Sequence, residues 1–137
     1  KEGMFAIRTA EFLREKDQSG RYLSSNGEET EKVVSGKRAK WMRLQGKQDG
    51  KKLGVIIMNH PESINYPCYW HARAYGLFAA NPLGQGMFEA QRKLENPTYF
   101  NLKLEPGESA LFKFRMVIYE GDRNQEQVEA AFLTYAE

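Results

Sequence analysis

Hydrophobic and polar residues alternate along most of this chain, in runs that glycine, proline, aspartate or asparagine interrupts. Alternation with a period of two is typical of antiparallel strands that turn one face to a core. The pattern predicts strands over residues 4–13, 39–45, 53–60, 69–78, 99–104 and 110–119. We therefore expect an all-β fold, an antiparallel β-sandwich with a short C-terminal helix.

Turn residues predict how some of these strands connect. Asp49-Gly50 joins 39–45 to 53–60 and is a strong hairpin signal. Glu105-Pro106-Gly107-Glu108 predicts a second hairpin between 99–104 and 110–119. The polar, glycine-bearing stretch 24–38 predicts a long loop.

The C-terminal part changes to helical periodicity. Asp122 or Asn124 can cap a helix, and the apolar residues after them recur at helical spacing: Val128, Ala131, Phe132 and Tyr135. We expect this apolar stripe to pack on a sheet or on a partner. No internal linker is visible, so residues 1–137 are interpreted as a single domain.

The parity of each strand predicts which residues are buried. In the strands 99–104 and 110–119 the even positions form the expected core, namely Phe100, Leu102, Leu104, Phe112, Phe114, Met116 and Ile118. Residues 53–60 are apolar on both faces, which favours a central strand that is covered on both sides.

The run 69–78 carries the most suggestive chemistry. Its even positions, from Trp70 to Phe78, are aromatic or small and are expected in the core. The opposite face combines two aromatic rings with an imidazole and a guanidinium, on Tyr69, His71, Arg73 and Tyr75. Such a row can contact a sugar ring and hold its oxygens. The alternative is a solvated sheet face that long side chains cover.

Composition and charge restrict the classes of partner. The chain has 137 residues, of which 41% are hydrophobic, as in a folded globular domain. The net charge of +2 gives no electrostatic footprint for nucleic acid. No apolar run approaches the length of a membrane span.

Several catalytic arrangements stay open. His60 stands at a predicted strand end, a position suited to an acid–base residue. A metal site would combine His60 and His71 with Glu62 or Glu89, although the spacing matches no tight ligand motif. Cys68 and His71 have opposite parity, so Cys68 is expected to be a buried small side chain. The cofactor stays unknown.

Several segments together resemble a known family. They are Lys1–Arg8, Gly20–Gly27, Gly36–Trp41, Asn59–Pro61 and, most specifically, Tyr69–Pro82. This ordered set is similar to the PmoA-like family of bacterial proteins, over roughly residues 1–121. The resemblance implies a β-sandwich like the galactose-mutarotase supersandwich, in a carbohydrate-utilisation setting. Family members are usually longer, so this chain is expected to be a C-terminal part.

The matching polar positions are the expected site residues: Arg8, Arg38, Trp41, His60, His71, Arg73 and Asn81. The chain departs from the family pattern at Asn59, where an acid often precedes the His-Pro pair, and at Asn65 and Tyr66, where basic residues are usual. These departures weaken the case for proton transfer by this loop.

The leading hypothesis is a carbohydrate-processing or sugar-binding protein, with His60 and His71 as catalytic candidates. Tyr69, Arg73 and Tyr75 would contact the sugar, together with Arg8, Arg38, Trp41 and Asn81. One alternative is a non-catalytic interaction module that docks through the C-terminal helix or through open sheet edges. Another is a metal-dependent enzyme that uses His60 and His71. Self-association and a periplasmic or cytoplasmic location both stay open.

Overall fold

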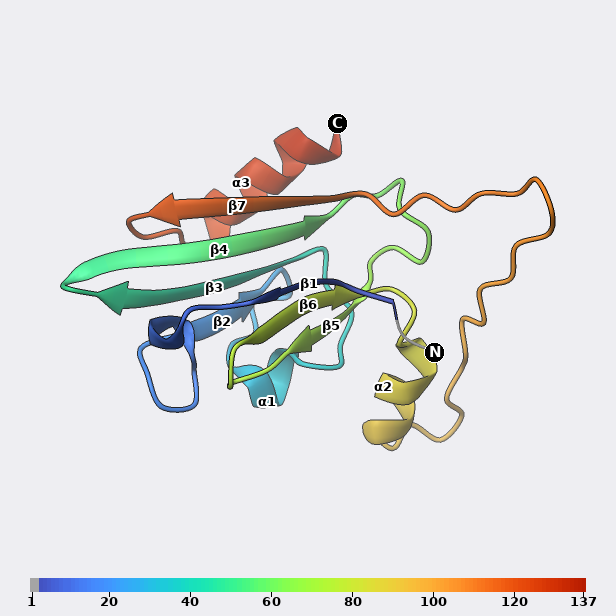
Figure 1. The fold of residues 1–137 in the computed structure, drawn as a ribbon, viewed down its shortest axis with the longest axis horizontal. Coiled ribbons are helices and arrows are strands. Elements are labelled where there is room, and N and C mark those ends of the chain that lie inside the picture. The colour runs from blue at the N-terminus through green and yellow to red at the C-terminus, as the bar shows by residue number, and fades with distance from the viewer. Residues whose placement is uncertain (1–2) are drawn as a thin grey trace.

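Two antiparallel sheets face each other in the computed structural model, which describes residues 3–137 (Figure 1). One sheet has three strands in the order β1-β6-β5, and the other has four in the order β2-β3-β4-β7. The predicted β-sandwich is confirmed. Lys1 and Glu2, the start of the first family segment, lie outside the described residues. The strands are β1 (Phe5–Arg8), β2 (Arg21–Ser24), β3 (Trp41–Gln48), β4 (Lys51–Asn59), β5 (Tyr69–Ala72), β6 (Leu77–Asn81) and β7 (Phe114–Glu120).

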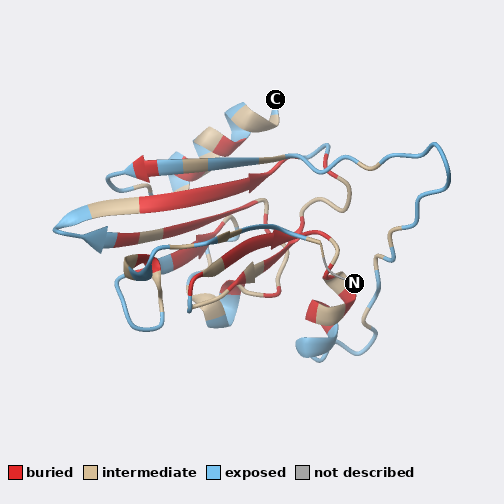
Figure 2. Ribbon diagram, in the orientation of Figure 1, coloured by how far each residue is buried: buried red, intermediate tan, exposed pale blue. Residues whose placement is uncertain are grey.

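The core lies between the two sheets. β4 is a central strand, as its two apolar faces predict, and pairs with β3 on one side and β7 on the other. Val55 and Ile57 face the three-stranded sheet and pack with Trp70 and Phe78. Figure 2 shows the buried residues concentrated along β3, β4 and β6. Cys68 belongs to this core and is fully buried, as expected.

The C-terminal helix α3 (Gln125–Ala136) covers the other face of the four-stranded sheet. Asn124 caps it, because its side chain accepts the Gln127 N–H at 2.9 Å while the Gln127 side chain accepts the Asn124 N–H. Val128 and Phe132 pack on this sheet, which confirms the predicted helix and its apolar stripe. Two residues of the stripe, Val128 and Phe132, are therefore buried against the protein's own sheet, while Ala131 and Tyr135 are half-buried.

The predicted hairpin at Asp49-Gly50 is confirmed. Both residues have positive φ, 51° for Asp49 and 76° for Gly50, as a two-residue hairpin turn requires. The prediction of one long strand over 69–78 is wrong. The chain turns between β5 and β6, where Gly76 has a φ of 102° and the Arg73 N–H donates to the Leu77 carbonyl at 2.8 Å. The row with alternate parity therefore ends at Ala72.

Two other predicted strands differ from the structure. The first is confined to β1, and a short 3-10 turn at Glu11–Leu13 replaces its second half. Residues 99–104 form no strand: the chain between the helix α2 (Gln85–Gln91) and β7 is a long irregular excursion (Figure 1). The predicted loop 24–38 contains one short helix, α1 (Glu31–Val34).

The core expected from the predicted strands 99–104 and 110–119 is also wrong. Ile118 is 73% exposed and Met116 is 41% exposed. Their face is the predicted one, because Ile118 lies opposite Val55 in the β4–β7 register. The three-stranded sheet ends at β1, so these two residues are left uncovered. Of the remaining expected core residues, Leu104 and Phe112 are exposed, while Phe100, Leu102 and Phe114 are half-buried.

Among residues 3–137, no helix has both the length and the apolar character that crossing a membrane would require.

Candidate functional site

A short backbone segment places Arg38 beside β5. The Gly36 N–H donates to the Trp70 carbonyl at 2.7 Å, and the Trp70 N–H donates to the Lys37 carbonyl at 3.2 Å. Residues 36–39 therefore run along the edge of β5 like an added strand. As a result, Arg38 and Tyr69 lie next to each other although they are distant in the sequence.

Tyr69 lies on the outer face of β5, and two side chains pack against its ring. The Arg38 guanidinium carbon is 4.7 Å from the ring centroid, and the Phe88 ring of α2 stacks with Tyr69 at 5.8 Å. The Tyr69 hydroxyl donates to a Glu89 carboxylate oxygen at 2.6 Å. Burial raises the pKa of Tyr69, and the Glu89 carboxylate raises it further, so the phenol stays a proton donor.

Glu89 is buried beside Tyr69 and is held by further donors. The Thr98 backbone N–H donates to its second carboxylate oxygen at 2.6 Å, and the Thr98 hydroxyl lies 3.0 Å from the same oxygen. The Tyr69 hydroxyl and the Thr98 N–H lower the pKa of the Glu89 carboxyl, despite its desolvation. Glu89 is therefore a fixed anion at neutral pH.

The terminal nitrogens of Arg38 donate to uncharged oxygens. One nitrogen donates to the Pro67 carbonyl at 2.7 Å and to the Asn65 carbonyl at 3.2 Å. The other donates to the side-chain oxygens of Asn65, at 3.1 Å, and Gln85, at 3.0 Å. These contacts fix the guanidinium without neutralising its charge.

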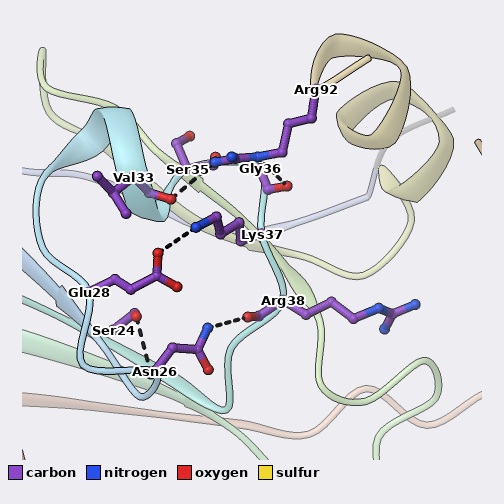
Figure 3. A network of polar contacts seen from close by, with 9 residues as sticks. All are labelled: Ser24, Asn26, Glu28, Val33, Ser35, Gly36, Lys37, Arg38 and Arg92. Atoms are coloured by element: carbon purple, nitrogen blue, oxygen red, sulfur yellow. Dashed lines mark hydrogen bonds and ion pairs between the residues drawn. The ribbon is translucent and has the colours of Figure 1, made fainter. Parts of the chain in front are cut away.

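Arg92, just after α2, is held in a similar way (Figure 3). Its guanidinium reaches across to the end of α1 and the loop that follows it, and donates to the carbonyls of Gly36, at 3.1 Å, Val33, at 3.1 Å, and Ser35. Gly36 is a required glycine, because its φ is 75° and a Cβ there would lie 3.3 Å from both Arg92 Nε and the Phe88 ring. Lys37, from the same loop, forms an ion pair with Glu28.

These side chains enclose an open cavity of about 450 Å³, which we call the Arg38 cavity. Its lining residues carry three cationic side chains and one carboxylate, so the cavity can donate several hydrogen bonds to a polar ligand and favours negative charge on it. The size falls within the range of small-molecule sites. The cavity is lined by Gly36, Lys37, Arg38, Tyr69, Glu89, Arg92 and Leu94.

One family model matches residues 1–133, and its description is a family of unknown function, DUF6807. The chain belongs to the DUF6807 family. No curated protein and no solved structure matches the chain. In this DUF6807 protein the candidate site therefore rests on the geometry of its own residues.

The Arg38 cavity of the DUF6807 chain brings together two of the site residues predicted from the sequence, Arg38 and Tyr69. Three others form a second group at the turn after β5. The ring centroid of Tyr75, which is 45% exposed, lies 5.3 Å from the guanidinium carbon of Arg8 and 5.7 Å from that of Arg73. Arg73 also pairs with Glu31 at 2.8 Å.

Two predicted residues lie under α3, away from the Arg38 cavity. Trp41 is fully buried and its indole N–H donates to Glu129 at 2.6 Å. His60 is buried, its Nδ1 accepts the Glu62 N–H at 3.1 Å, and its ring meets the edge of Tyr135 at 5.0 Å. Both sets of contacts are those of side chains that hold α3 on the sheet.

The remaining two predicted residues are near the cavity but do not line it. His71 shares the outer face of β5 with Tyr69, as its parity predicts, and its ring meets the edge of Phe88 at 5.4 Å. Asn81 is fully buried on β6, in register with Tyr69. His60 and His71 contact different helices. Within the described part of the chain, no three or more His, Cys, Asp or Glu residues gather as a metal site would need.

Sequence reasoning did not find the role of α2, which supplies Gln85, Phe88, Glu89 and, at its end, Arg92. A signal was present, because residues 87–93 are mostly strong helix formers after the break at Pro82. The two glycines in 84–86 and the short length of the run concealed it. Without α2, neither the cover over β5 nor the carboxylate beside Tyr69 can be predicted.

Proposed function

We propose that this protein binds a small carbohydrate in the Arg38 cavity. One observation carries the proposal: guanidinium groups from two separate segments and a buried carboxylate converge on one cavity, and each is already fixed by hydrogen bonds. Sugars present many hydroxyl groups, which need both donors and acceptors in fixed positions. Preorganised groups bind such a ligand with little loss of side-chain entropy.

The resemblance of Tyr69–Pro82 and the other segments to the PmoA-like family supports the same class of ligand. The β-sandwich agrees with the supersandwich that this resemblance implies. The role of Tyr69 in this proposal differs from the contact between its ring and a sugar ring that the sequence predicts. Because the Arg38 guanidinium and the Phe88 ring already pack against the Tyr69 ring, Tyr69 would contact the sugar through its edge and its hydroxyl.

A thermal-shift screen against hexoses, hexuronic acids and divalent metals tests the proposal. A ligand at about 100 times its Kd stabilises the native state by about 2.7 kcal/mol, so binding raises the melting temperature. We expect at least one sugar to raise it in the wild type and to lose this effect in Arg38→Met. The matched control is Arg21→Met, which removes an exposed arginine that pairs with Glu29.

A screen in which no sugar shifts the melting temperature of the folded wild type would refute the proposal. A shift caused by metal alone would favour the metal-dependent alternative. If Arg38→Met is itself much less stable, Arg38→Lys keeps the charge while losing the forked donors. Isothermal titration of Arg38→Lys then measures the contribution of that geometry.

Partner binding through a sheet edge is a second candidate function. Met116 and Ile118 are exposed on the inward face of β7, and β1 is the terminal strand of the three-stranded sheet as described. A strand added beside β1 would cover these side chains and extend the sheet. This candidate uses a different surface from the Arg38 cavity, so the two functions are compatible.

A further inference from the structure

A second cavity adjoins the Arg38 cavity at Arg92. It has a volume of about 340 Å³, shares Gly36 and Arg92 with the first, and is otherwise lined in part by Glu31, Arg73 and Phe88. We call it the Arg73 cavity. Because the two cavities share a wall, the side chain of Arg92 stands between two adjacent binding spaces along the outer side of β5.

The charges around the two cavities are unequally balanced. Arg73 pairs with Glu31 at 2.8 Å, and Lys37 pairs with Glu28. By contrast, the hydrogen bonds of Arg38 and Arg92 within the described residues go to carbonyl and amide oxygens. Uncharged oxygens orient a guanidinium but leave its positive charge in place. Glu89 is the one carboxylate among the residues that line the Arg38 cavity, so it offsets one of the two charges on Arg38 and Arg92 and an excess of one positive charge remains.

We propose that the ligand is an acidic disaccharide whose carboxylate binds Arg92, with one sugar in each cavity. This inference rests on the proposed function, and it adds the charge and the length of the ligand. The Nε and one terminal nitrogen of Arg92 donate to the carbonyls of Val33, Ser35 and Gly36, and its other terminal nitrogen donates to none of the described residues, so that nitrogen can donate to a carboxylate. The fixed anion Glu89 also lines the Arg38 cavity, where its two oxygens accept hydrogen bonds from Tyr69 and Thr98.

Isothermal titration with matched sugars tests this assignment. The probes are galacturonic, glucuronic and mannuronic acid, the hexose of each configuration and its 6-phosphate, and the 1,4-linked disaccharide of each acid and each hexose. We expect at least one acid to bind tenfold or more tightly than its hexose, and its disaccharide to bind more tightly still. Raising the salt concentration should weaken binding of the acids and leave binding of the hexoses unchanged.

Variants locate the acid group. Arg92→Gln should weaken binding of the acid about tenfold or more and have little effect on the hexose, because a charge-assisted contact is lost. Arg73→Gln should weaken the acidic disaccharide more than the monosaccharide. The matched control is Lys103→Gln, which removes an exposed cation on the excursion before β7. Circular dichroism and the melting temperature establish that each variant is folded.

The outcomes separate this inference from the proposed function. If hexoses bind as tightly as their acids, the charge assignment is wrong and the proposed function stands. If acids bind but Arg92→Gln binds them equally well, the acid group lies elsewhere. Tighter binding of a hexose phosphate than of every acid would overturn the carboxylate assignment. If no sugar binds at all, the proposed function fails as well.

Discussion

Arg38, Arg92 and Glu89 are single residues whose surroundings fix both their position and their charge. The two arginines are oriented by uncharged oxygens, and the carboxylate of Glu89 is oriented by a phenol and by the backbone of Thr98. Each of these side chains therefore keeps its charge and has a fixed orientation in the cavity before a ligand binds. This preorganisation is the basis of the proposed ligand site.

Glu89 makes the stability of the fold depend on pH. Its folded pKa is lowered, so the ionised form stabilises the native state above the ordinary value of 4.5, and this contribution is lost as the pH falls through the folded pKa. Glu89→Gln should therefore lower the melting temperature at pH 7 and do so progressively less toward pH 3. Calorimetry between pH 3 and pH 7 measures these melting temperatures, and Glu95→Gln, at an exposed position, is the control. If the difference in melting temperature between the wild type and Glu89→Gln stayed constant with pH, Glu89 would not have a lowered pKa in the folded state.

Cys68 should be chemically inert in the native protein. It is fully buried, and burial raises the pKa of its thiol, so very little reactive thiolate forms. A thiol reagent such as 5,5′-dithiobis(2-nitrobenzoic acid) should react slowly with the native protein and fully after unfolding in urea. Rapid reaction in the absence of denaturant would show that Cys68 is accessible.

At the scale of elements, the two longer helices have different tasks. α3 packs on the four-stranded sheet through Val128 and Phe132, and Glu129 accepts hydrogen bonds from Lys40 and Trp41. α2 instead covers the outer face of β5 and carries site residues. α3 therefore stabilises the fold, whereas α2 supplies residues of the candidate site.

Substitutions in α3 test this division. Phe132 is 2% exposed, so Phe132→Ala should lower the free energy of unfolding by about 3–5 kcal/mol. Leu133, next to it and 56% exposed, is the matched control, and Leu133→Ala should change it by less than about 0.5 kcal/mol. Urea unfolding measures both. Equal effects of the two variants would mean that α3 does not pack as described.

The sequence predicted elements best where a single local signal decided them. Asp49-Gly50 located the first hairpin, and Asn124 with its helical spacing located α3. The sequence predicted elements least well where contacts with a distant segment of the chain determine where an element begins or ends. The alternation over 69–78 continues through the turn, so it conceals the reversal that Gly76 allows with its φ of 102°.

The same reason explains the errors in burial. Parity assigned Met116 and Ile118 to the inward face, which is correct, but whether that face is covered depends on how far the opposite sheet extends. For the candidate site, Arg38 and Tyr69 were predicted individually. Their meeting depends on the pairing of residues 36–39 with β5 and on α2, which are both tertiary features.

At the scale of the whole molecule, the sandwich has one closed side and one open side. α2 and the loop 33–38 cover the β5 side. On the other side the inward face of β7 extends beyond β1 and leaves apolar residues exposed to solvent. Exposed apolar surface next to a terminal strand favours association with another strand.

Ile118→Lys tests whether this surface associates. Since Ile118 is 73% exposed, the substitution should change the free energy of unfolding by less than about 0.5 kcal/mol. If the surface binds a second copy, light scattering after size exclusion should show a mass that rises with concentration in the wild type and not in the variant. A wild type that stays monomeric at every concentration would argue against self-association.

The central claim is that a carbohydrate binds between the loop 33–38, β5 and α2. Amide chemical shifts of the ¹⁵N-labelled protein, followed while the best sugar of the screen is added, test it most directly. We predict that the largest changes fall on residues 36–38, Tyr69 and residues 89–94, with little change near His60 or along β7. Changes concentrated around His60 and Tyr135, or along the edges of β1 and β7, would contradict this location of the site.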